Sequence, residues 1–499
     1  MATEQPGLLR DFYRKRLRQI WLIRVFKNTV WVLMWMIRWK ILYRLEQGLG
    51  FLFWAVRWRI VRPLARAIFP RATLNRLHGF RDGGFKSLIR RRTVPALPLV
   101  SVNDWINTSI FDFNAEPGVN LKEPNVRLES TSTLNSNVTV VLINRSENVC
   151  IASPMVYSGG LGICVPIHDQ SYSFPRIEVI EVRDAEVVGR SNLVSSKGQV
   201  IHHDLYRFSH DFTSEELHGK VVINPKKKTI RRISKPEIKY KLAMAAVFTD
   251  SCSSNYAHWL TEVLPRINIF CRTQHNVDVP LIVDSGLHPN IEASLMAVAG
   301  AEAKIIRLNV GDAAYVERLL VTSPTGYIPF DRRINSKSGH IHGVFSPYAI
   351  SFLREQLAKS LSKPVKSLPD KIFLRRNSHS RLMKNEQLLE ERLITLGFTI
   401  VQPEILSFSE QFHLFSAASI IVGATGAALA NLIFCLRDVR IVICISAHPD
   451  HSFGYWQNMA VAAGTQVTYV LGSISGPKAQ GVHADFLIDV DEVVRAIER

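Results

Sequence analysis

The sequence is poor in cysteine and lacks the apolar runs that cross membranes. Its 499 residues include six cysteines without a CxxC pair, so we interpret them as reduced, apolar side chains. The longest charge-free stretches in the basic first part, residues 28–37 and 47–56, have ten residues each, about half of what a spanning helix needs. The first residues also lack the apolar region of a secretory signal. These absences predict a cytoplasmic protein that does not cross a bilayer.

Several signatures of catalysis and metal binding are also absent. The sequence has no Walker loop and no Ser-His-Asp set with a nucleophile turn. Asp489 and Asp491 have the Asp-x-Asp spacing of a metal site, but they open the last helical segment, so we interpret them as acids of a helix N-terminus. His202-His203-Asp204 and His340-Ile341-His342 are incomplete ligand sets and are more typical of exposed loops. We therefore expect no bound metal.

Acidic residues are scarce at the start of the chain. Residues 1–92 contain 21 Lys and Arg but four Asp and Glu, with six of the nine tryptophans, whereas the remainder has 40 basic and 39 acidic residues. Tryptophan and cations on helices too short to span are typical of the membrane interface. We expect residues 1–92 to form a helical membrane-associating segment, with residues 1–70 docked on the anionic inner face of the cell membrane. An acidic partner or a second copy of the chain is the alternative; nucleic acid is not expected, because no module for it is present.

Short apolar runs between residues 371 and 444 predict parallel strands. KIFL, FTIV, SIIV and RIVICI alternate with segments of helical period, which is the pattern of strands joined by crossover helices. Residues 99–240 instead alternate β-branched runs with Gly, Asn and Ser turns, which predicts a β-rich portion. We therefore expect an α/β protein with an N-terminal lobe at 99–345, including this portion, and a C-terminal lobe at 346–499.

Two features lie at the predicted carboxyl ends of these strands, where α/β sheets bind ligands. The turn at 423–428 has almost no side-chain bulk, so the next helix can begin close to a ligand and direct its N–H groups at an anion. Arg375 and Arg376 follow KIFL and are well placed to bind phosphate oxygens. The alternatives are a turn of small residues that only permits packing, and a solvated arginine pair. Together the two features favour phosphate binding.

A polar stripe is predicted on an otherwise buried helix. His258, Glu262 and Arg266 recur every four residues and share one face, while Trp259 and Val263 face a core. Such a series can fix one tautomer of the imidazole and orient it as a base for a hydroxyl. From spacing alone we favour the alternative, a salt-bridged helix with a satisfied interior histidine.

Over residues 240–470 the chain resembles glycosyltransferase family 61, because four blocks occur in the family's order. They are NYAHWLTEVLPR at 255–266, FLRR at 373–376 with Arg381 and Asn385, FSEQ at 408–411, and GATGAALAN at 423–431. The resemblance, to enzymes of the capsule and polysaccharide biosynthesis type, implies a GT-B fold with two Rossmann-like lobes facing a cleft. It also implies inverting transfer from a nucleotide sugar without an obligatory metal or other cofactor. With the membrane segment, we expect a polysaccharide or lipid-linked glycan as the acceptor.

The resemblance also implies roles for individual residues, and it reverses the preference for an interior histidine. His258 or Glu262 would take the acceptor proton, with Tyr256 and Arg266 as further cleft residues. Glu410 is expected to contact a ribose or sugar hydroxyl. The positions expected to bind the donor are Arg375, Arg376, Arg381, Asn385, Glu410, Gln411, Gly423, Thr425, Gly426, Ala427 and Asn431.

The chain departs from the family pattern at Thr425. Many members have histidine at this place in the glycine turn, so no role of an imidazole can be carried over, although the threonine hydroxyl can still donate to phosphate. This departure is the basis of an alternative function, a non-catalytic membrane-associated scaffold of polysaccharide assembly that retains the fold.

Overall fold

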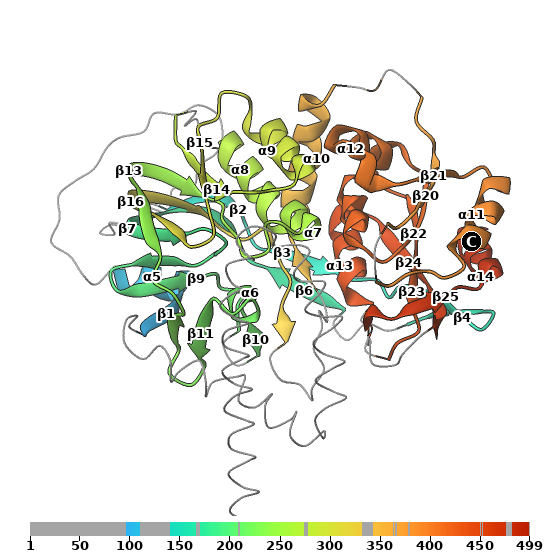
Figure 1. The fold of residues 1–499 in the computed structure, drawn as a ribbon, viewed down its shortest axis with the longest axis horizontal. Helices are drawn as coiled ribbons and strands as arrows, with labels where there is room; N and C mark the ends of the chain where they lie inside the picture. Colours follow the sequence, from blue (N-terminus) through green and yellow to red (C-terminus); the bar gives the residue numbers. More distant parts are fainter. Residues whose placement is uncertain are drawn as a thin grey trace, which may run out of the picture. The chain divides into compact units, whose positions relative to one another are not determined.

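The computed structural model of the chain contains two large β-sheets with helices packed against them (Figure 1). This mixture of strands and helices confirms the predicted α/β class. The predicted membrane-associating segment and the triplet His340-Ile341-His342 lie outside the described residues. The structure describes residues 96–109, 140–165, 170–207, 210–273, 278–331, 343–362, 364, 367–377, 380–449, 451, 453–475 and 482–498.

Five parallel strands form the centre of the second sheet, and four of them are those predicted from the apolar runs. Their order in the sheet, β21-β20-β22-β23-β24, is the doubly wound order 2-1-3-4-5. The chain adds β21 on one side of β20 and then adds β22, β23 and β24 on the other side. This reversal of the strand order creates a switch point at the carboxyl ends of β20 and β22. The strands are β20 (Lys371–Leu374), β21 (Thr399–Val401), β22 (Ile420–Ala424), β23 (Arg440–Ser446) and β24 (Gln466–Ser475).

Both faces of this sheet are buried because successive side chains point to opposite sides. Ile372 and Ile421 belong to one core, whereas their neighbours Phe373 and Val422 belong to another. Figure 1 shows α12 and α13 on one side of the strands and α11 and α14 on the other. These elements are α11 (Glu386–Thr395), α12 (Phe408–Ala417), the 3₁₀-helix η4 (Ala427–Phe434), α13 (Gly454–Ala463) and α14 (Val490–Glu498).

The first sheet combines parallel strands with a longer antiparallel extension. β16, β13, β14 and β15 are parallel neighbours, and β7 joins β16 in antiparallel register. The extension supplies the expected β-rich portion. The sheet consists of β1 (Leu97–Ser101), β2 (Val140–Asn144), β7 (Ile177–Val188), β8 (Val194–Ser196), β9 (Gln199–His202), β11 (Val221–Asn224), β12 (Thr229–Arg232), β13 (Glu237–Val247), β14 (Leu281–Asp284), β15 (Ile305–Leu308) and β16 (Asp312–Thr322).

One continuous core connects the two sheets. It contains Phe248 and Leu281 from the first sheet and Ile372 and Ile421 from the second, with helices α8, α9, α10 and α12 between them. Two strands from the first half of the chain also join the second sheet, where β4 pairs in parallel with β24. The sheets are therefore not divided cleanly at residue 346. These elements are α8 (Leu264–Thr273), α9 (Pro289–Ala299), α10 (Pro347–Ser360), β4 (Met155–Ser158) and β5 (Leu161–Cys164).

The remaining elements are short. The antiparallel pairs are β3 (Glu147–Cys150) with β6 (Ser171–Phe174), β10 (Asp211–Phe212) with β18 (Phe330–Asp331), and β17 (Gly326–Tyr327) with β19 (Val344–Phe345). β25 (Asp485–Leu487) adds to β24. The other helices are α5 (Val102–Ser109), α6 (Ser214–Leu217), α7 (Tyr256–His258), the π-helical turn η2 (Trp259–Val263) and η3 (Pro403–Ile405).

The aspartates at the start of α14 cap the helix, as predicted. Asp489 Oδ1 accepts hydrogen bonds from the N–H groups of Asp491 and Glu492, at 2.9 and 3.3 Å. Within the described ranges, His, Cys, Asp and Glu side chains form no group of three or more that could hold a metal ion. No helix in those ranges combines the length and apolar character needed to span a membrane.

Candidate active site

A cavity of about 340 Å³ lies at the switch point of the second sheet. Its floor is formed by Leu374 at the end of β20, by Arg375 and Arg376, which follow this strand, by Ala424 at the end of β22, and by Gly426 in the glycine turn. We call it the switch-point cavity. Its position agrees with the rule that open α/β sheets bind ligands beyond the carboxyl ends of their strands where the strand order reverses.

The opposite wall of the switch-point cavity comes from the first half of the chain. Ser254 reaches it from the loop before α7, Tyr256 from the start of α7, and His288 and Asn290 from the start of α9. Asn290 Nδ2 donates to the carbonyl of Leu406 at 2.8 Å, which joins α9 to the segment before α12. The cavity therefore lies between two parts of the chain that are far apart in sequence.

The two adjacent arginines, predicted to act together, have different environments. Arg375 forms a bidentate ion pair with Glu390, with Nε to Oε1 at 2.6 Å, and its side chain is 48% exposed. This pair raises the pKa of Arg375. Arg376 points inward, and its Nη1 donates to the carbonyl of Thr425 in the glycine turn. Both line the switch-point cavity, but only the inward guanidinium is held against the turn.

Arg376 is half-buried, like Arg381, and its charge acts on Arg381 and on the exposed His483. Burial, and then the neighbouring charge of Arg381, lowers the pKa of Arg376 to about 10. Burial also lowers the pKa of Arg381. The pKa of His483 is lowered by burial and by both arginines. Within the described part of the chain, Arg381 Nε is buried without a hydrogen-bond partner. Like charges held together in this way form a site for an anion.

Arg381 also has an unusual backbone. Its φ of 57° lies in the left-handed region, which is costly for a residue with a Cβ atom. Such a conformation persists only where surrounding structure imposes it, which is a common feature of binding sites.

Gly426 is the position in the turn where absence of a side chain matters most. A Cβ atom built at Gly426 would collide with Nη1 of Arg376. Gly423 lies against the next strand, where a Cβ would come within 3.0 Å of Leu374 Cβ. The absence of a side chain at Gly426 therefore leaves space for the Arg376 guanidinium. The sequence predicts a different use of the small residues, which is close approach of the backbone to a ligand.

Gly426→Ala should therefore displace Arg376 and weaken nucleoside diphosphate binding about tenfold or more, the loss of one charge-assisted hydrogen bond. Isothermal titration calorimetry measures the affinity. If the collision is the cause, adding Gly426→Ala to Arg376→Ala should produce little further loss. Additive losses in the double variant would show that the glycine acts independently of the arginine.

The departure at Thr425 is accommodated by a tryptophan. Thr425 is buried, and its hydroxyl oxygen accepts a hydrogen bond from Trp456 Nε1 at 3.1 Å. Its N–H donates to the carbonyl of Cys444 at 3.2 Å. The side chain is held by α13, while its backbone carbonyl receives Arg376. Trp456 has no counterpart among the predicted site residues, since nothing in the local sequence connects it to the turn.

A chain of side-chain hydrogen bonds connects three predicted site residues across the switch-point cavity. The Tyr256 hydroxyl donates to Asn431 Oδ1 at 2.9 Å, and Asn431 Nδ2 donates to Gln411 Oε1 at 2.8 Å. Gln411 Nε2 in turn donates to the carbonyl of Pro403 at 3.0 Å. Asn431 and Gln411 are buried. These hydrogen bonds hold α7, which forms one wall of the cavity, in a fixed position relative to η4 and α12.

Among the predicted donor residues, Arg375, Arg376, Gln411, Gly426 and Ala427 line the switch-point cavity, whereas Arg381, Asn385, Glu410, Gly423, Thr425 and Asn431 do not. Asn385 and Glu410 serve the fold. The Asn385 amide bonds the N–H and the carbonyl of Ile488, at 3.0 and 2.8 Å. Glu410 is exposed and forms a capping box with Ser407 at the start of α12. Neither lines the switch-point cavity, whereas Glu404, which the sequence analysis did not select, does. It follows β21, so the rule about carboxyl ends of parallel strands could have identified it.

The predicted helix around His258 contains a π-helical turn, η2. Pro265 has no N–H, so it cannot bond the carbonyl of Thr261, which instead accepts from the Thr325 hydroxyl at 3.3 Å. Trp259 and Val263 are fully buried, as expected from their spacing. Single π turns within helices frequently mark functional sites.

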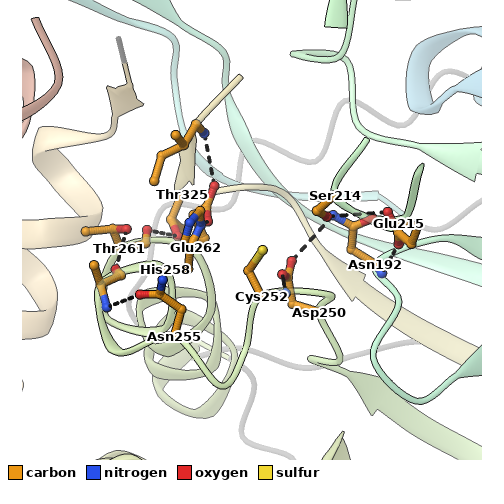
Figure 2. A network of polar contacts seen from close by, with 12 residues as sticks. Asn192, Ser214, Glu215, Asp250, Cys252, Asn255, His258, Thr261, Glu262 and Thr325 are labelled. Carbon is orange, nitrogen blue, oxygen red and sulfur yellow. Dashed lines mark hydrogen bonds and ion pairs between the residues drawn. The ribbon is translucent and has the colours of Figure 1, made fainter. Parts of the chain in front are cut away.

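His258 and Glu262 form a buried pair on this helix (Figure 2). His258 Nδ1 bonds Glu262 Oε2, while Glu262 Oε1 accepts from the N–H of Ile328 at 3.0 Å. Burial alone would lower the pKa of His258, but the charge and hydrogen bond of Glu262 outweigh it, and the pKa is raised. Burial raises the pKa of Glu262. A carboxylate with both oxygens engaged in this way fixes the ring and its tautomer.

A second, smaller cavity of about 40 Å³ is adjacent to this pair, and we call it the histidine cavity. His258, Glu262 and Arg266 line it from the helix, and Asn192 and His203 from the antiparallel part of the first sheet. Arg266 does not ion-pair with Glu262 by direct contact; burial lowers its pKa against the opposing effect of nearby carboxylates. The predicted stripe therefore faces a cavity.

The hydroxyl of Tyr455 responds to charges on two site residues. Burial raises its pKa, the negative charge of Glu262 adds to this effect, and the positive charge of Arg381 opposes it. Tyr455 lines neither cavity. No sequence motif marks it, because it follows a loop outside the four blocks.

The prediction that His202 and His203 are exposed loop residues is wrong. His202 is 4% exposed at the end of β9, and its ring stacks on Tyr206 with centroids 4.6 Å apart. Its Nδ1 accepts from the N–H of His203 at 2.8 Å. Burial lowers the pKa of His202 to about 3 and the pKa of His203 well below its ordinary value. Packing of β9 against the loop at Tyr206 encloses both rings.

Comparison with protein families agrees with this arrangement. The family model described as Glycosyltransferase 61 matches residues 256–442, a span that starts at Tyr256 and includes the pair in η2, the arginines after β20 and the glycine turn. A search of curated proteins found no match. The matched region holds the residues that line both cavities from α7, β20 and β22. Residues 256–442 therefore form a region similar to glycosyltransferase family 61, which supports glycosyltransferase activity for this chain.

Proposed function

We propose that the enzyme transfers a sugar from a nucleotide-sugar donor to a hydroxyl of a polysaccharide or lipid-linked glycan, with inversion at the anomeric carbon. The observation that carries the proposal is the switch-point cavity, which Arg376 lines, with the charge of Arg381 acting on Arg376. A volume of about 340 Å³ is in the range of small-ligand sites, and two neighbouring guanidinium groups favour an anion as the ligand. A GT-B arrangement is supported by the doubly wound order of the second sheet beside the parallel strands of the first.

The diphosphate of the donor is the anion that fits this cavity. Arg376 and Arg381 neutralise the charge that develops on the leaving diphosphate as the glycosidic bond breaks. The N–H groups at the start of η4 contribute positive dipoles at the same edge. Glu404 and Asn290, on the remaining walls, are placed to bind hydroxyl groups of the donor.

His258 is the base in this proposal, and Glu262 is the residue that orients it. The acceptor oxygen attacks the anomeric carbon, the bond between that carbon and the diphosphate oxygen breaks, and its electron pair leaves with the diphosphate. The acceptor proton passes to the imidazole of His258, which Glu262 orients through its contact with Nδ1. No metal takes part in these steps.

A panel of nucleotide sugars, screened for release of the nucleoside diphosphate, tests the proposed function. We expect slow hydrolysis of one donor class and faster release when a glycan acceptor is added. A folded protein that binds no nucleotide and hydrolyses no donor would favour the scaffold alternative associated with Thr425.

We also propose that residues 1–70 attach the enzyme to the cytosolic face of the cell membrane. The support is compositional: tryptophans and cations gather in this segment, while the rest of the chain is almost neutral.

The full chain should sediment with vesicles that contain anionic phosphatidylglycerol, and residues 71–499 should stay in the supernatant. Binding of the full chain should fall as salt is raised, because salt screens the attraction to anionic headgroups. Equal sedimentation of both proteins would contradict the assignment of the anchor.

A further inference from the structure

The histidine cavity offers more hydrogen-bonding capacity than the protein itself uses. Three buried atoms of its lining residues, Asn192 Oδ1, His203 Nδ1 and Arg266 Nε, have no partner among the described residues. Buried polar atoms are almost always paired, since an unmade bond costs the full desolvation penalty. Three such atoms around one small cavity indicate that a polar group enters it.

The neighbours of Asn192 determine which atom of its amide is available. Its backbone N–H donates to Glu215 Oε1 at 2.9 Å, and its side-chain Nδ2 is 3.4 Å from Asp250 Oδ2. Figure 2 shows Asp250 between the His258–Glu262 pair and the Asn192–Glu215 group. Because a carboxylate only accepts hydrogen bonds, the amide nitrogen must face Asp250. The oxygen is therefore the unpaired atom, and it accepts.

The three atoms together select a neutral hydroxyl. Arg266 Nε–H can only donate, and Asn192 Oδ1 can only accept. His203, which burial keeps neutral, can do either, depending on its tautomer. A hydroxyl both donates and accepts hydrogen bonds, so it can accept from Arg266 Nε–H and donate to Asn192 Oδ1. A carboxylate or phosphate would face the oxygen of Asn192 and the nearby carboxylates of Asp250 and Glu262.

The size and walls of the cavity fit the edge of a sugar. About 40 Å³ holds a few water-sized groups but not a sugar ring. Tyr327 and Phe330 also line the cavity, and aromatic rings can cover the apolar C–H face of a ring that remains outside. Two adjacent hydroxyls, or one hydroxymethyl group, therefore match the space beside His258.

We propose that the histidine cavity is the acceptor subsite, in which Asn192, His203 and Arg266 bind hydroxyls of a neutral sugar and present a neighbouring hydroxyl to His258. This inference rests on the proposed function and gives the antiparallel part of the first sheet its role, selection of the acceptor. Asn192 and His203 lie outside the region that matches the family model.

The probes are methyl β-glycosides of glucose, galactose, N-acetylglucosamine and xylose, with methyl β-glucuronide as a charged comparison. Their binding to the full chain, saturated with nucleoside diphosphate, is measured by saturation-transfer NMR; where a donor is turned over, acceptor KM and kcat are measured as well. We expect at least one neutral glycoside to bind and the glucuronide to bind more weakly. Asn192→Ala should raise the Kd or KM of that glycoside at least tenfold, with a smaller change in kcat.

The matched control is Asn268→Ala, because Asn268 is a fully buried amide with two unpartnered polar atoms that does not line either cavity. It should leave glycoside binding unchanged. Melting temperature and nucleoside diphosphate affinity show whether Asn192→Ala is folded, and His203→Asn gives a second test if it is not.

Three results would overturn the subsite: no neutral glycoside binds, the glucuronide binds best, or the Asn192 and His203 variants bind like the control. A wrong proposed function would give a different pattern of results. In that case no nucleotide would bind and no donor would be hydrolysed, whereas glycoside binding could still depend on Asn192.

Discussion

Replacing Arg376 with alanine should lower the affinity for a nucleoside diphosphate about 10- to 100-fold, the expected loss for charge-assisted hydrogen bonds to phosphate. Arg376 is the inward member of the pair, held against the glycine turn and next to Arg381. Removing it leaves one half-buried guanidinium to neutralise the diphosphate. Isothermal titration with UDP and GDP measures the change.

Arg375→Ala is the matched control, one residue away on the same strand end. Its guanidinium is half exposed and already paired with Glu390. Because Glu390 already neutralises this guanidinium, it has little charge left for a diphosphate, and we expect an affinity loss below about fivefold. If the two variants lose affinity equally, or if Arg375→Ala loses more, Arg376 is not the main diphosphate ligand.

His258→Gln should reduce kcat about 100- to 10,000-fold while the affinity for nucleoside diphosphate is retained, because general bases typically contribute a factor of this size. The amide keeps much of the shape of the ring and can still bond Glu262, but it cannot take a proton. Steady-state rates and calorimetry separate the two effects. A kcat within about tenfold of the original would exclude His258 as the base.

The pH dependence gives an independent test of the pair. A base acts in its deprotonated form, so the rate should rise as pH increases through the pKa of His258. Glu262 raises that pKa. In Glu262→Gln the negative charge is gone while burial still lowers the pKa, so the acidic limb of kcat/KM should move to lower pH. A limb that stays in place or moves to higher pH would show that Glu262 does not act on His258 in this way.

The strands of the second sheet could be predicted from the sequence because burial on both faces makes them continuous apolar runs. KIFL, FTIV, SIIV and RIVICI each correspond to one parallel strand. The glycine turn and the inward arginine were also accessible, since both follow directly from a strand. The capping role of Asp489 was accessible for the same reason, because caps are local.

Other site features depend on contacts between distant segments. Glu410 and Asn385 match the family blocks, but their side chains bond Ser407 and Ile488 within the fold. Glu404 lines the switch-point cavity without a motif to mark it. His202 and His203 are expected in an exposed loop from the sequence, and only the packing around β9 shows that His202 is buried and His203 is half-buried.

The sequence by itself determined the α/β class, the edge of the sheet where the switch-point cavity lies, and the resemblance to glycosyltransferase family 61, because these follow from periodicity and from residues close together along the chain. The tertiary structure decided that Arg376 faces inward and Arg375 outward, that Glu262 orients His258, and that Asn192 faces the same cavity. Side-chain direction and burial depend on which distant segments pack together, and local sequence does not specify that packing.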